Sequence, residues 1–339
     1  MKKAIYYILF FTIIISGIAS CNNSGESLKS VIIRGNIFGT IYSVTYYSTD
    51  GENLKEEIDS IFNDFNNTLS YYNPNSLISR INRNETSTPD DYFLRVYNRS
   101  SEISKETNGD FDVTVSPLVN IWGFGFENKA EVTKYKIDSI LDFVGYQKAR
   151  IKDGKLVKDD ERISFDFNAI AKGYAADVIG EFLLSRGIEI FLVEIGGDLV
   201  TKGLKPGNKK WKIGIEKPAQ NYDDPQDWQY LIEIHDQAVA TSGNYRRYYE
   251  EDGLRYSHTI DPQTGYPVKH NLLSATVIAD DALTADAFAT AFMVMGLEEA
   301  IEFTNSKDNI EAFFIYSAGE DLLETYTSEG IEIINRNDL

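Results

Sequence analysis

The chain has 339 residues, of which 33 are basic and 52 are acidic, so its formal net charge is −19 at pH 7. A nucleic-acid groove or a patch for anionic lipids is not expected, because both need clustered Lys and Arg. One cysteine and three histidines without a close pair leave no intrachain disulfide and no thiolate metal site, and they argue against zinc. A metal ion would therefore be held by oxygen or nitrogen atoms.

The N-terminus has the layout of a secretory signal, with two lysines before an apolar run over residues 4–19. The run is short for a membrane span of about 20 residues. It ends in Ile-Ala-Ser before Cys21, a lipobox in which the cysteine is lipidated and becomes the new N-terminus. We predict a signal peptide at residues 1–20, a flexible tether at residues 21–30, and an exported protein held by lipid on the periplasmic side of the inner membrane. A signal anchor with an incidental cysteine is the alternative.

Residues 31–339 are predicted to form one α+β domain, because strands and helices mix without regular βαβ alternation. Apolar spacing predicts strands at residues 41–47, 163–167, 188–195, 211–215, 231–234, 238–241 and 274–278. The same analysis predicts helices at residues 52–69, 170–186 and 282–295. Gly187 is placed to end the second of these helices.

Five places combine polar, aromatic and glycine residues in patterns that neither a core nor a surface requires. They are FGT at residues 38–40, FDVTVSPLVNIWGFGF at 111–126, DFNAIAKGYAAD at 166–177, EIGGDL at 194–199, and the pair SHTIDPQTGYP at 257–267 with TADAFAT at 284–290. In the last, Asp286 and Thr290 share one face of a predicted helix. That face suits Mg²⁺, which takes oxygen ligands and is completed by water and phosphates. Both residues also fit an ordinary helix, with Asp286 near its start and Thr290 bonded to a carbonyl.

Two further stretches place charge or glycine at the ends of elements. Asp166 and Lys172 flank a helix start, where free N–H groups, the helix dipole and an ammonium together suit a phosphate. An N-cap role for Asp166 and an ordinary solvated Lys172 are the alternatives. Gly196-Gly197-Asp198 after a strand is most simply a tight turn, with a weak potential to cradle phosphate.

The aromatic and histidine stretches suggest contacts to a ligand. Trp122, Phe124 and Phe126 lie among glycines. Their rings suit packing against a flat ligand, and packing within the hydrophobic core is the alternative. His258 precedes a predicted turn at residues 261–265, and it is the best general base by residue type. A structural hydrogen-bonding role for His258 is the alternative.

In this order, the pieces FGT, FDVTVSPLVNIWGFG, FDFNAIAKGYAAD, VEIGGDL, ATSGNYRRYY, YSHTIDPQTG and TADAFATAFMVMG resemble the FAD:protein FMN transferase family, also called the ApbE family. The resemblance runs from Phe38 to Gly296. It implies one large catalytic domain, related to the T-fold, with two lobes around an FAD cleft. It also agrees with the lipobox, because members are commonly exported lipoproteins.

The resemblance implies Mg²⁺-dependent transfer of FMN from FAD to a threonine or serine hydroxyl of an acceptor protein, with release of AMP. The implied acceptors are subunits of membrane flavoenzymes such as sodium-pumping NADH:quinone oxidoreductases and Rnf-type complexes. An FAD pyrophosphatase that yields FMN and AMP, and a lipid-anchored FAD-binding protein without catalysis, are the alternatives.

The resemblance also implies roles for individual residues. By matching position, Asp286, Thr290 and the backbone carbonyl of Ala169 are expected to bind magnesium. FAD contacts are expected from Tyr72, Trp122, Gly123, Phe124, Asp166, Lys172, His258 and Ile260. Phe38 stands where the family usually has methionine, and its ring can still pack on the flavin. His258 is the expected base for the acceptor hydroxyl, with Asp261 or another acidic residue near the metal as its rival.

Overall fold

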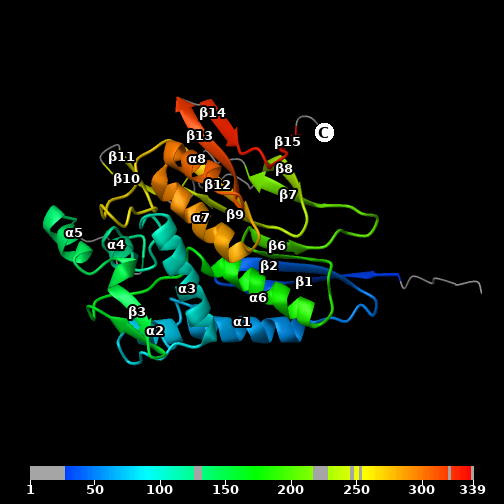
Figure 1. The fold of residues 1–339 in the computed structure, drawn as a ribbon, viewed down its shortest axis with the longest axis horizontal. Helices are drawn as coiled ribbons and strands as arrows, with labels where there is room; N and C mark the ends of the chain where they lie inside the picture. The colour runs from blue at the N-terminus through cyan, green and yellow to red at the C-terminus, as the bar shows by residue number, and fades with distance from the viewer. Residues whose placement is uncertain are drawn as a thin grey trace, which may run out of the picture.

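The computed structural model describes residues 27–125, 132–216, 228–244, 248–251, 254–319 and 322–336 (Figure 1). Its centre is an eight-stranded sheet in which every pair of neighbours is antiparallel. In spatial order the strands are β1 (Lys29–Ile37), β2 (Thr40–Ser48), β5 (Phe191–Ile195), β6 (Asp198–Lys202), β9 (Ala238–Gly243), β12 (Leu272–Ala279), β13 (Glu311–Gly319) and β14 (Leu322–Thr327).

The other elements surround this sheet. A three-stranded sheet has the order β15 (Ile334–Asn335), β8 (Trp228–Ile234) and β7 (Trp211–Glu216), and two hairpins are formed by β3 (Ala149–Lys152) with β4 (Lys155–Lys158) and by β10 (Tyr248–Glu251) with β11 (Leu254–Ser257). The helices are α1 (Lys55–Leu69), α2 (Leu77–Asn82), α3 (Asp91–Glu106), α4 (Ser116–Ile121), α5 (Lys134–Leu141), α6 (Ala171–Ser185), α7 (Ala282–Met295) and α8 (Leu297–Asn305), with a 3-10 turn at Tyr146–Lys148. No helix in these described ranges is long and apolar enough to cross a membrane.

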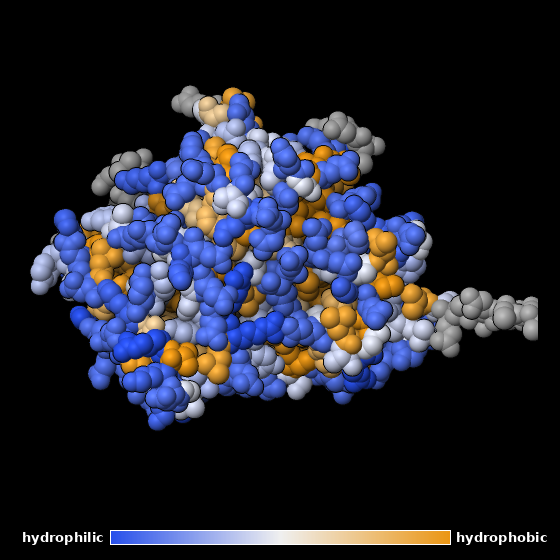
Figure 2. All heavy atoms as spheres, in the orientation of Figure 1, coloured by the Kyte–Doolittle hydropathy of each residue, from blue (hydrophilic) through white to orange (hydrophobic). Residues whose placement is uncertain are grey.

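Both faces of the central sheet are covered. Helix α6 packs against β5 and β6, and α7 packs against β9 and β12. Alternate residues of the same strands, such as Leu199 and Val239, point the other way and join an apolar cluster with Trp211 and Ile232 of the small sheet. The result is a layer of helices, a central sheet and a small second sheet. The face drawn in Figure 2 is mostly hydrophilic with scattered apolar side chains, in keeping with the charged composition.

Most predicted elements form close to their predicted positions. Helix α7 has the predicted bounds, because Asp281 caps it by accepting a hydrogen bond from Thr284 N at 2.8 Å and Gly296 follows it with a φ of +84°. The predicted turn at Gly196-Gly197 joins β5 to β6, and both glycines have positive φ values, 58° and 98°.

The strand predicted at residues 163–167 does not form. Its apolar pattern comes from burial, since Phe165 and Phe167 are both fully buried. The backbone N–H and C=O groups of Phe165 instead bond to the side-chain amide of Asn82, each at 2.8 Å, and Asp166 N donates to Val113 O. These backbone groups of Phe165 and Asp166 are therefore paired without a partner strand.

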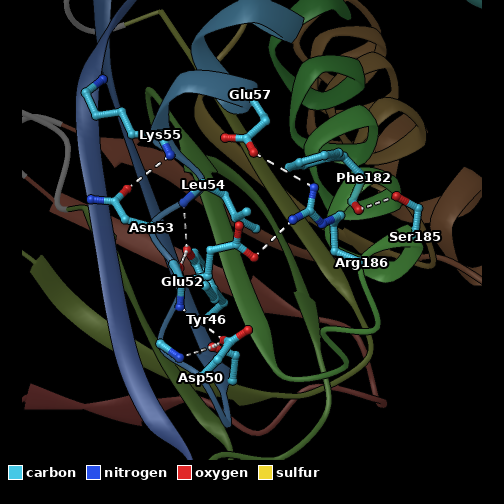
Figure 3. A network of polar contacts seen from close by, with 12 residues as sticks. Tyr46, Asp50, Glu52, Asn53, Leu54, Lys55, Glu57, Phe182, Ser185 and Arg186 are labelled. Carbon is cyan, nitrogen blue, oxygen red and sulfur yellow. Dashed lines mark hydrogen bonds and ion pairs between the residues drawn. The ribbon is translucent and has the colours of Figure 1, made fainter.

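A polar network fixes the C-terminal end of α6 (Figure 3). Arg186 follows that helix, and its guanidinium lies 3.0 Å from Glu52 in the connection from β2 to α1 and 3.8 Å from Glu57 in the first turn of α1. Leu54 N donates to the hydroxyl of Tyr46 at 3.1 Å, which ties the same connection to β2. The far end of α6 is therefore anchored, while its N-terminal end faces α7.

Candidate active site

The N-terminal end of α6 and the first turns of α7 lie in close contact. Asp177 of α6 is buried and accepts hydrogen bonds from Ala282 N at 2.9 Å and Leu283 N at 2.8 Å, which are free donors at the start of α7. A Cβ atom on Gly173 would lie 2.0 Å from the carbonyl oxygen of Ala282, so only glycine allows this approach. The approach brings Lys172 beside Asp286.

Asp286 joins the two helices. Its side chain is almost fully buried, and Oδ2 accepts a hydrogen bond from Gly173 N at 3.1 Å, one of the free donors at the start of α6. Its other oxygen, Oδ1, lies 3.6 Å from Lys172 Nζ. Thr290 follows one turn later on α7, and its hydroxyl lies 3.3 Å from the hydroxyl of Ser242 on β9. The predicted carboxylate therefore lies beside the predicted lysine, and the predicted hydroxyl lies one turn further along α7, beside β9.

Asp198, which the sequence indicates only as part of a turn, is the closest partner of Lys172. Its carboxylate is 1% exposed and forms an ion pair with Lys172 Nζ through Oδ2. Its Oδ1 accepts a hydrogen bond from Thr241 N at 3.3 Å. Burial and the negative charge of Asp286 raise the pKa of Asp198, while its ion pair with Lys172 opposes that rise. Burial lowers the pKa of Lys172, but the charges of Asp198 and Asp286 outweigh this and raise it.

This cluster suits a hard cation better than a soft one. Asp286 and Thr290 offer oxygen atoms, which Mg²⁺ prefers, and so few protein ligands leave positions for water and phosphate. Among the residues that the structure describes, no group of three or more His, Cys, Asp or Glu side chains is arranged to hold a metal ion. Ala169, the predicted carbonyl ligand, is partly buried two residues before α6.

Asp166 lies on the same approach to α6 but does not cap that helix, whose N-cap residue is Ile170. Its Oδ1 accepts a hydrogen bond from Asn168 N at 2.8 Å, so it caps the preceding turn. Burial raises the pKa of Asp166 to about 6, against the opposing effect of this hydrogen bond.

The aromatic segment after α4 is joined to the segment at residues 257–267. Trp122 Nε1 donates to Gly265 O at 2.8 Å, and the Trp122 ring lies 5.7 Å from that of Tyr266. The rings of Phe124 and His258 are 6.4 Å apart, and their planes meet at 67°. Gly123 between the two aromatics has a φ of +78°, which favours glycine. A cavity of about 590 Å³ adjoins this junction, and its lining includes Trp122, Asp261, Tyr266, His270 and Met295.

Asp261 shapes the turn that follows His258. Its Oδ1 accepts hydrogen bonds from Gln263 N and Thr264 N at 2.8 and 3.3 Å, and its Oδ2 accepts one from the Thr264 hydroxyl at 2.7 Å. Ile260 beside it is buried. Both carboxylate oxygens of Asp261 are therefore engaged within the turn.

Phe38 and Tyr72 lie near the C-terminal end of α1. Phe38 occupies the turn between β1 and β2 with a φ of +52°, and its ring lies 5.4 Å from that of Phe65. Tyr72 follows α1 and is 63% exposed, while the neighbouring Tyr71 hydroxyl lies 2.8 Å from the Ser116 hydroxyl. The ring of Tyr72 lies 6.4 Å from that of Tyr71 in an edge-to-face arrangement.

We expect the substitution Asp110→Asn to flatten the dependence of stability on pH. Asp110 Oδ1 accepts a hydrogen bond from Gln263 Nε2 at 2.8 Å, which an asparagine oxygen can keep. Burial and the charges of Glu299 and Asp261 raise the pKa of Asp110 from 3.8 to about 6. A raised native pKa gives stability that is present below pH 4 and lost as pH rises through 6. Between pH 4 and pH 7 the free energy of unfolding of the wild type should therefore fall by about 1 to 3 kcal/mol relative to that of the variant.

Urea unfolding of both proteins at several pH values between 4 and 7 checks this expectation. Parallel curves for the two proteins would show that Asp110 titrates as an ordinary surface carboxylate.

Comparison with known proteins assigns the chain to a family. Residues 38–314 match the ApbE family. The chain is 38% identical over 293 residues to a Vibrio cholerae protein named FAD:protein FMN transferase, with 84% of this chain and 86% of that protein covered. A Haemophilus influenzae protein of the same name is 34% identical over 330 residues, with 93% of each covered. The chain belongs to the ApbE family, and the family expected from its motifs is confirmed.

Solved structures agree with this assignment. The fold matches the flavin transferase ApbE of Vibrio cholerae with a TM-score of 0.78 at 35% identity, covering 89% of this chain and 98% of that one. It matches the apo form of the flavinyl transferase ApbE of Pseudomonas stutzeri with a TM-score of 0.79 at 34% identity, covering 89% and 95%. The predicted α+β, ApbE-like fold is confirmed.

Proposed function

We propose that the protein is a Mg²⁺-dependent FAD:protein FMN transferase. The observation that carries this proposal is the 38% identity, over 84% of the chain, to a protein of that name. The cluster of Lys172, Asp286 and Thr290 adds chemical support, since an ammonium beside oxygen ligands at a helix start suits a pyrophosphate. Neither a storage protein nor a simple flavin carrier needs such a cluster.

The proposed reaction joins FMN to the acceptor protein. The hydroxyl oxygen of an acceptor threonine or serine forms a bond to the phosphorus of the FMN half of FAD. The bond from that phosphorus to the bridging oxygen breaks, and AMP leaves with that oxygen. The hydroxyl proton passes to a ring nitrogen of His258. Phosphoryl transfer of this kind depends mainly on positioning and charge neutralisation.

The chain supplies both of these contributions. Asp286, Thr290 and the carbonyl of Ala169 would hold the magnesium ion. When bound, this ion would neutralise charge that develops on the pyrophosphate oxygens. Lys172 at the start of α6 would bind the phosphates, which the positive end of that helix dipole also favours. Asp166, Tyr72, Phe38, Ile260 and the Trp122-Gly123-Phe124 segment would orient the nucleotide and the flavin.

The location and the acceptor are further parts of the proposal. Residues 1–20 and Cys21 lie outside the described residues, and their sequence supports export and lipid attachment at the periplasmic side of the inner membrane. A tether of about ten residues would confine the enzyme near that surface and raise the effective concentration of membrane-bound acceptors. Subunits of sodium-pumping NADH:quinone oxidoreductases or Rnf-type complexes suit this arrangement as acceptors.

Incubation of the purified protein with FAD, Mg²⁺ and an acceptor that carries the target threonine tests the function. A fluorescent covalent flavin band on the acceptor together with AMP release is the expected result. AMP and free FMN without that band would instead indicate an FAD pyrophosphatase. Binding of FAD without either product would indicate a flavin-binding lipoprotein.

We expect His258→Gln to lower the rate of FMN transfer by at least about 100-fold, because a positioned general base contributes about 100- to 10,000-fold. FAD affinity should change much less, since glutamine keeps a polar side chain of similar reach. The rate of covalent flavin formation at saturating FAD measures the effect, across a range of pH.

His270→Gln is the matched control, because His270 Nε2 lies 2.9 Å from the carbonyl oxygen of Met293, a contact that a glutamine amide can replace. This control should keep most of the activity. If Asp261→Asn abolished transfer while His258→Gln did not, the base would be Asp261.

A further inference from the structure

Lys172 lies between two buried carboxylates that come from different elements. Asp198 begins β6, next to the Gly196-Gly197 turn, and Asp286 lies in α7. The ammonium forms its closer ion pair with Asp198, while Asp286 Oδ1 is 3.6 Å away. The lysine side chain is 32% exposed, whereas the side chains of Asp198 and Asp286 are 1% and 4% exposed. One cation is therefore shared unequally by two carboxylates.

Asp198 is held in place independently of Lys172. Thr241 N on β9 donates to its Oδ1, so its Oδ2 faces the lysine. The Gly-Gly turn before it fixes where β6 begins, since both glycines have positive φ values. Asp286 is also held, because its Oδ2 accepts a hydrogen bond from Gly173 N. Both carboxylates are therefore fixed in place, and the Lys172 ammonium divides its ion pairing between them.

We propose that Asp198 is a positioning residue, which takes the closer ion pair with Lys172 and so keeps its ammonium from pairing fully with Asp286, whose Oδ1 can then bind the magnesium ion. The inference rests on the proposed function, and it adds a role for a residue outside the expected ligand and flavin contacts. A lysine paired fully with Asp286 would compete with a divalent cation for the same oxygen atoms. Asp198 weakens that competition and still leaves the ammonium beside the site, where a phosphate can reach it.

The charges of the cluster make the proposal quantitative. Two carboxylates and one ammonium carry a net charge of −1, which suits a divalent cation. The isosteric variant Asp198→Asn removes one charge and also releases Lys172 toward Asp286. We expect its Mg²⁺ affinity to fall by at least about 10-fold, in line with the loss of a buried charge partner. Lys172→Gln should bind Mg²⁺ at least as tightly as the wild type, because the competing ammonium is gone.

The double variant separates positioning from a simple loss of charge. If Asp198 acts through Lys172, then Asp198→Asn should have little effect in the Lys172→Gln background. If Asp198 acts only as a nearby negative charge, Asp198→Asn should lower the Mg²⁺ affinity by the same factor in both backgrounds. Glu194→Gln is the matched control, since Glu194 accepts a hydrogen bond from Gly197 N at 3.1 Å in the same turn. This control should leave Mg²⁺ binding almost unchanged.

Calorimetric titration of Mg²⁺ into the full-length protein, with and without AMP, measures all of these affinities without reference to activity. Equal effects of Asp198→Asn in the two backgrounds would overturn the inference while leaving the proposed function intact. A wild-type protein that binds no Mg²⁺ under either condition would overturn the metal assignment and this inference with it. If Asp198→Asn does not fold, Lys172→Gln alone still decides, because weaker Mg²⁺ binding by that variant contradicts competition by the lysine.

Discussion

Asp286→Asn is expected to lower the rate of FMN transfer by at least about 100-fold, since a metal ion supplies several kcal/mol of charge stabilisation in the transition state. The asparagine oxygen can still accept the hydrogen bond that Gly173 N donates to Asp286 Oδ2. The contact between α6 and α7 is therefore kept, and only the negative charge is lost. The rate of covalent flavin formation on the acceptor, measured at saturating FAD and over a range of Mg²⁺ concentrations, checks the expectation.

Asp281→Asn is the matched control for this variant. Asp281 caps the start of the same helix, and its side chain accepts a hydrogen bond from Thr284 N at 2.8 Å. Asparagine is as good an N-cap as aspartate, so this change removes a charge near the site without loss of the cap. It should keep nearly all of the transfer activity. Equal activities for Asp286→Asn and wild type would show that Asp286 does not bind the metal.

Local sequence patterns predict the helix and the turn that carry the site residues, because the residues that define each element lie close together in the sequence. The bounds of α7 follow from apolar spacing between an N-cap aspartate and a glycine. The turn between β5 and β6 follows from two consecutive glycines. The pairing of Asp286 with Thr290 follows from helical spacing alone, and the structure places both side chains toward the region of Lys172 and β9.

Contacts between distant segments could not be predicted in this way. Asp198 pairs with Lys172 across 26 positions of the chain, and nothing in the local pattern marks it as more than a turn residue. The segment at residues 163–167 has the apolar alternation of a strand, yet its backbone bonds to Asn82, which lies 83 residues from Phe165. Single-sequence spacing carries no information on such long-range partners.

Gly173 and Asp177 illustrate the same limit within one motif. Both lie in the stretch at residues 166–177, where the pattern indicates a helix with a functional lysine. The structure shows that they also lock α6 to α7, one by its lack of a Cβ atom and the other through hydrogen bonds to Ala282 N and Leu283 N. The motif therefore positions Lys172 as well as supplying it.

Gly173→Ala is expected to destabilise the protein by about 2 to 4 kcal/mol and to impair transfer, although alanine favours a helix over glycine by about 1 kcal/mol. The new Cβ atom would lie 2.0 Å from the carbonyl oxygen of Ala282 and 2.9 Å from the Cβ of Asp286. Backbone cannot yield as a flexible side chain can, so α6 and α7 must separate. That separation would move Lys172 away from Asp286.

Gly180→Ala provides the comparison within the same helix. Its Cβ atom would approach the ring of Phe191 at 3.2 Å, a contact that a small shift of the ring can relieve, and the gain in helix propensity offsets the crowding. Urea unfolding should therefore find Gly180→Ala close to the wild type and Gly173→Ala well below it. Equal stability of the two variants would contradict the tight packing of α6 on α7. Loss of transfer by Gly173→Ala under conditions where it remains folded would show that this packing sets the geometry of the site.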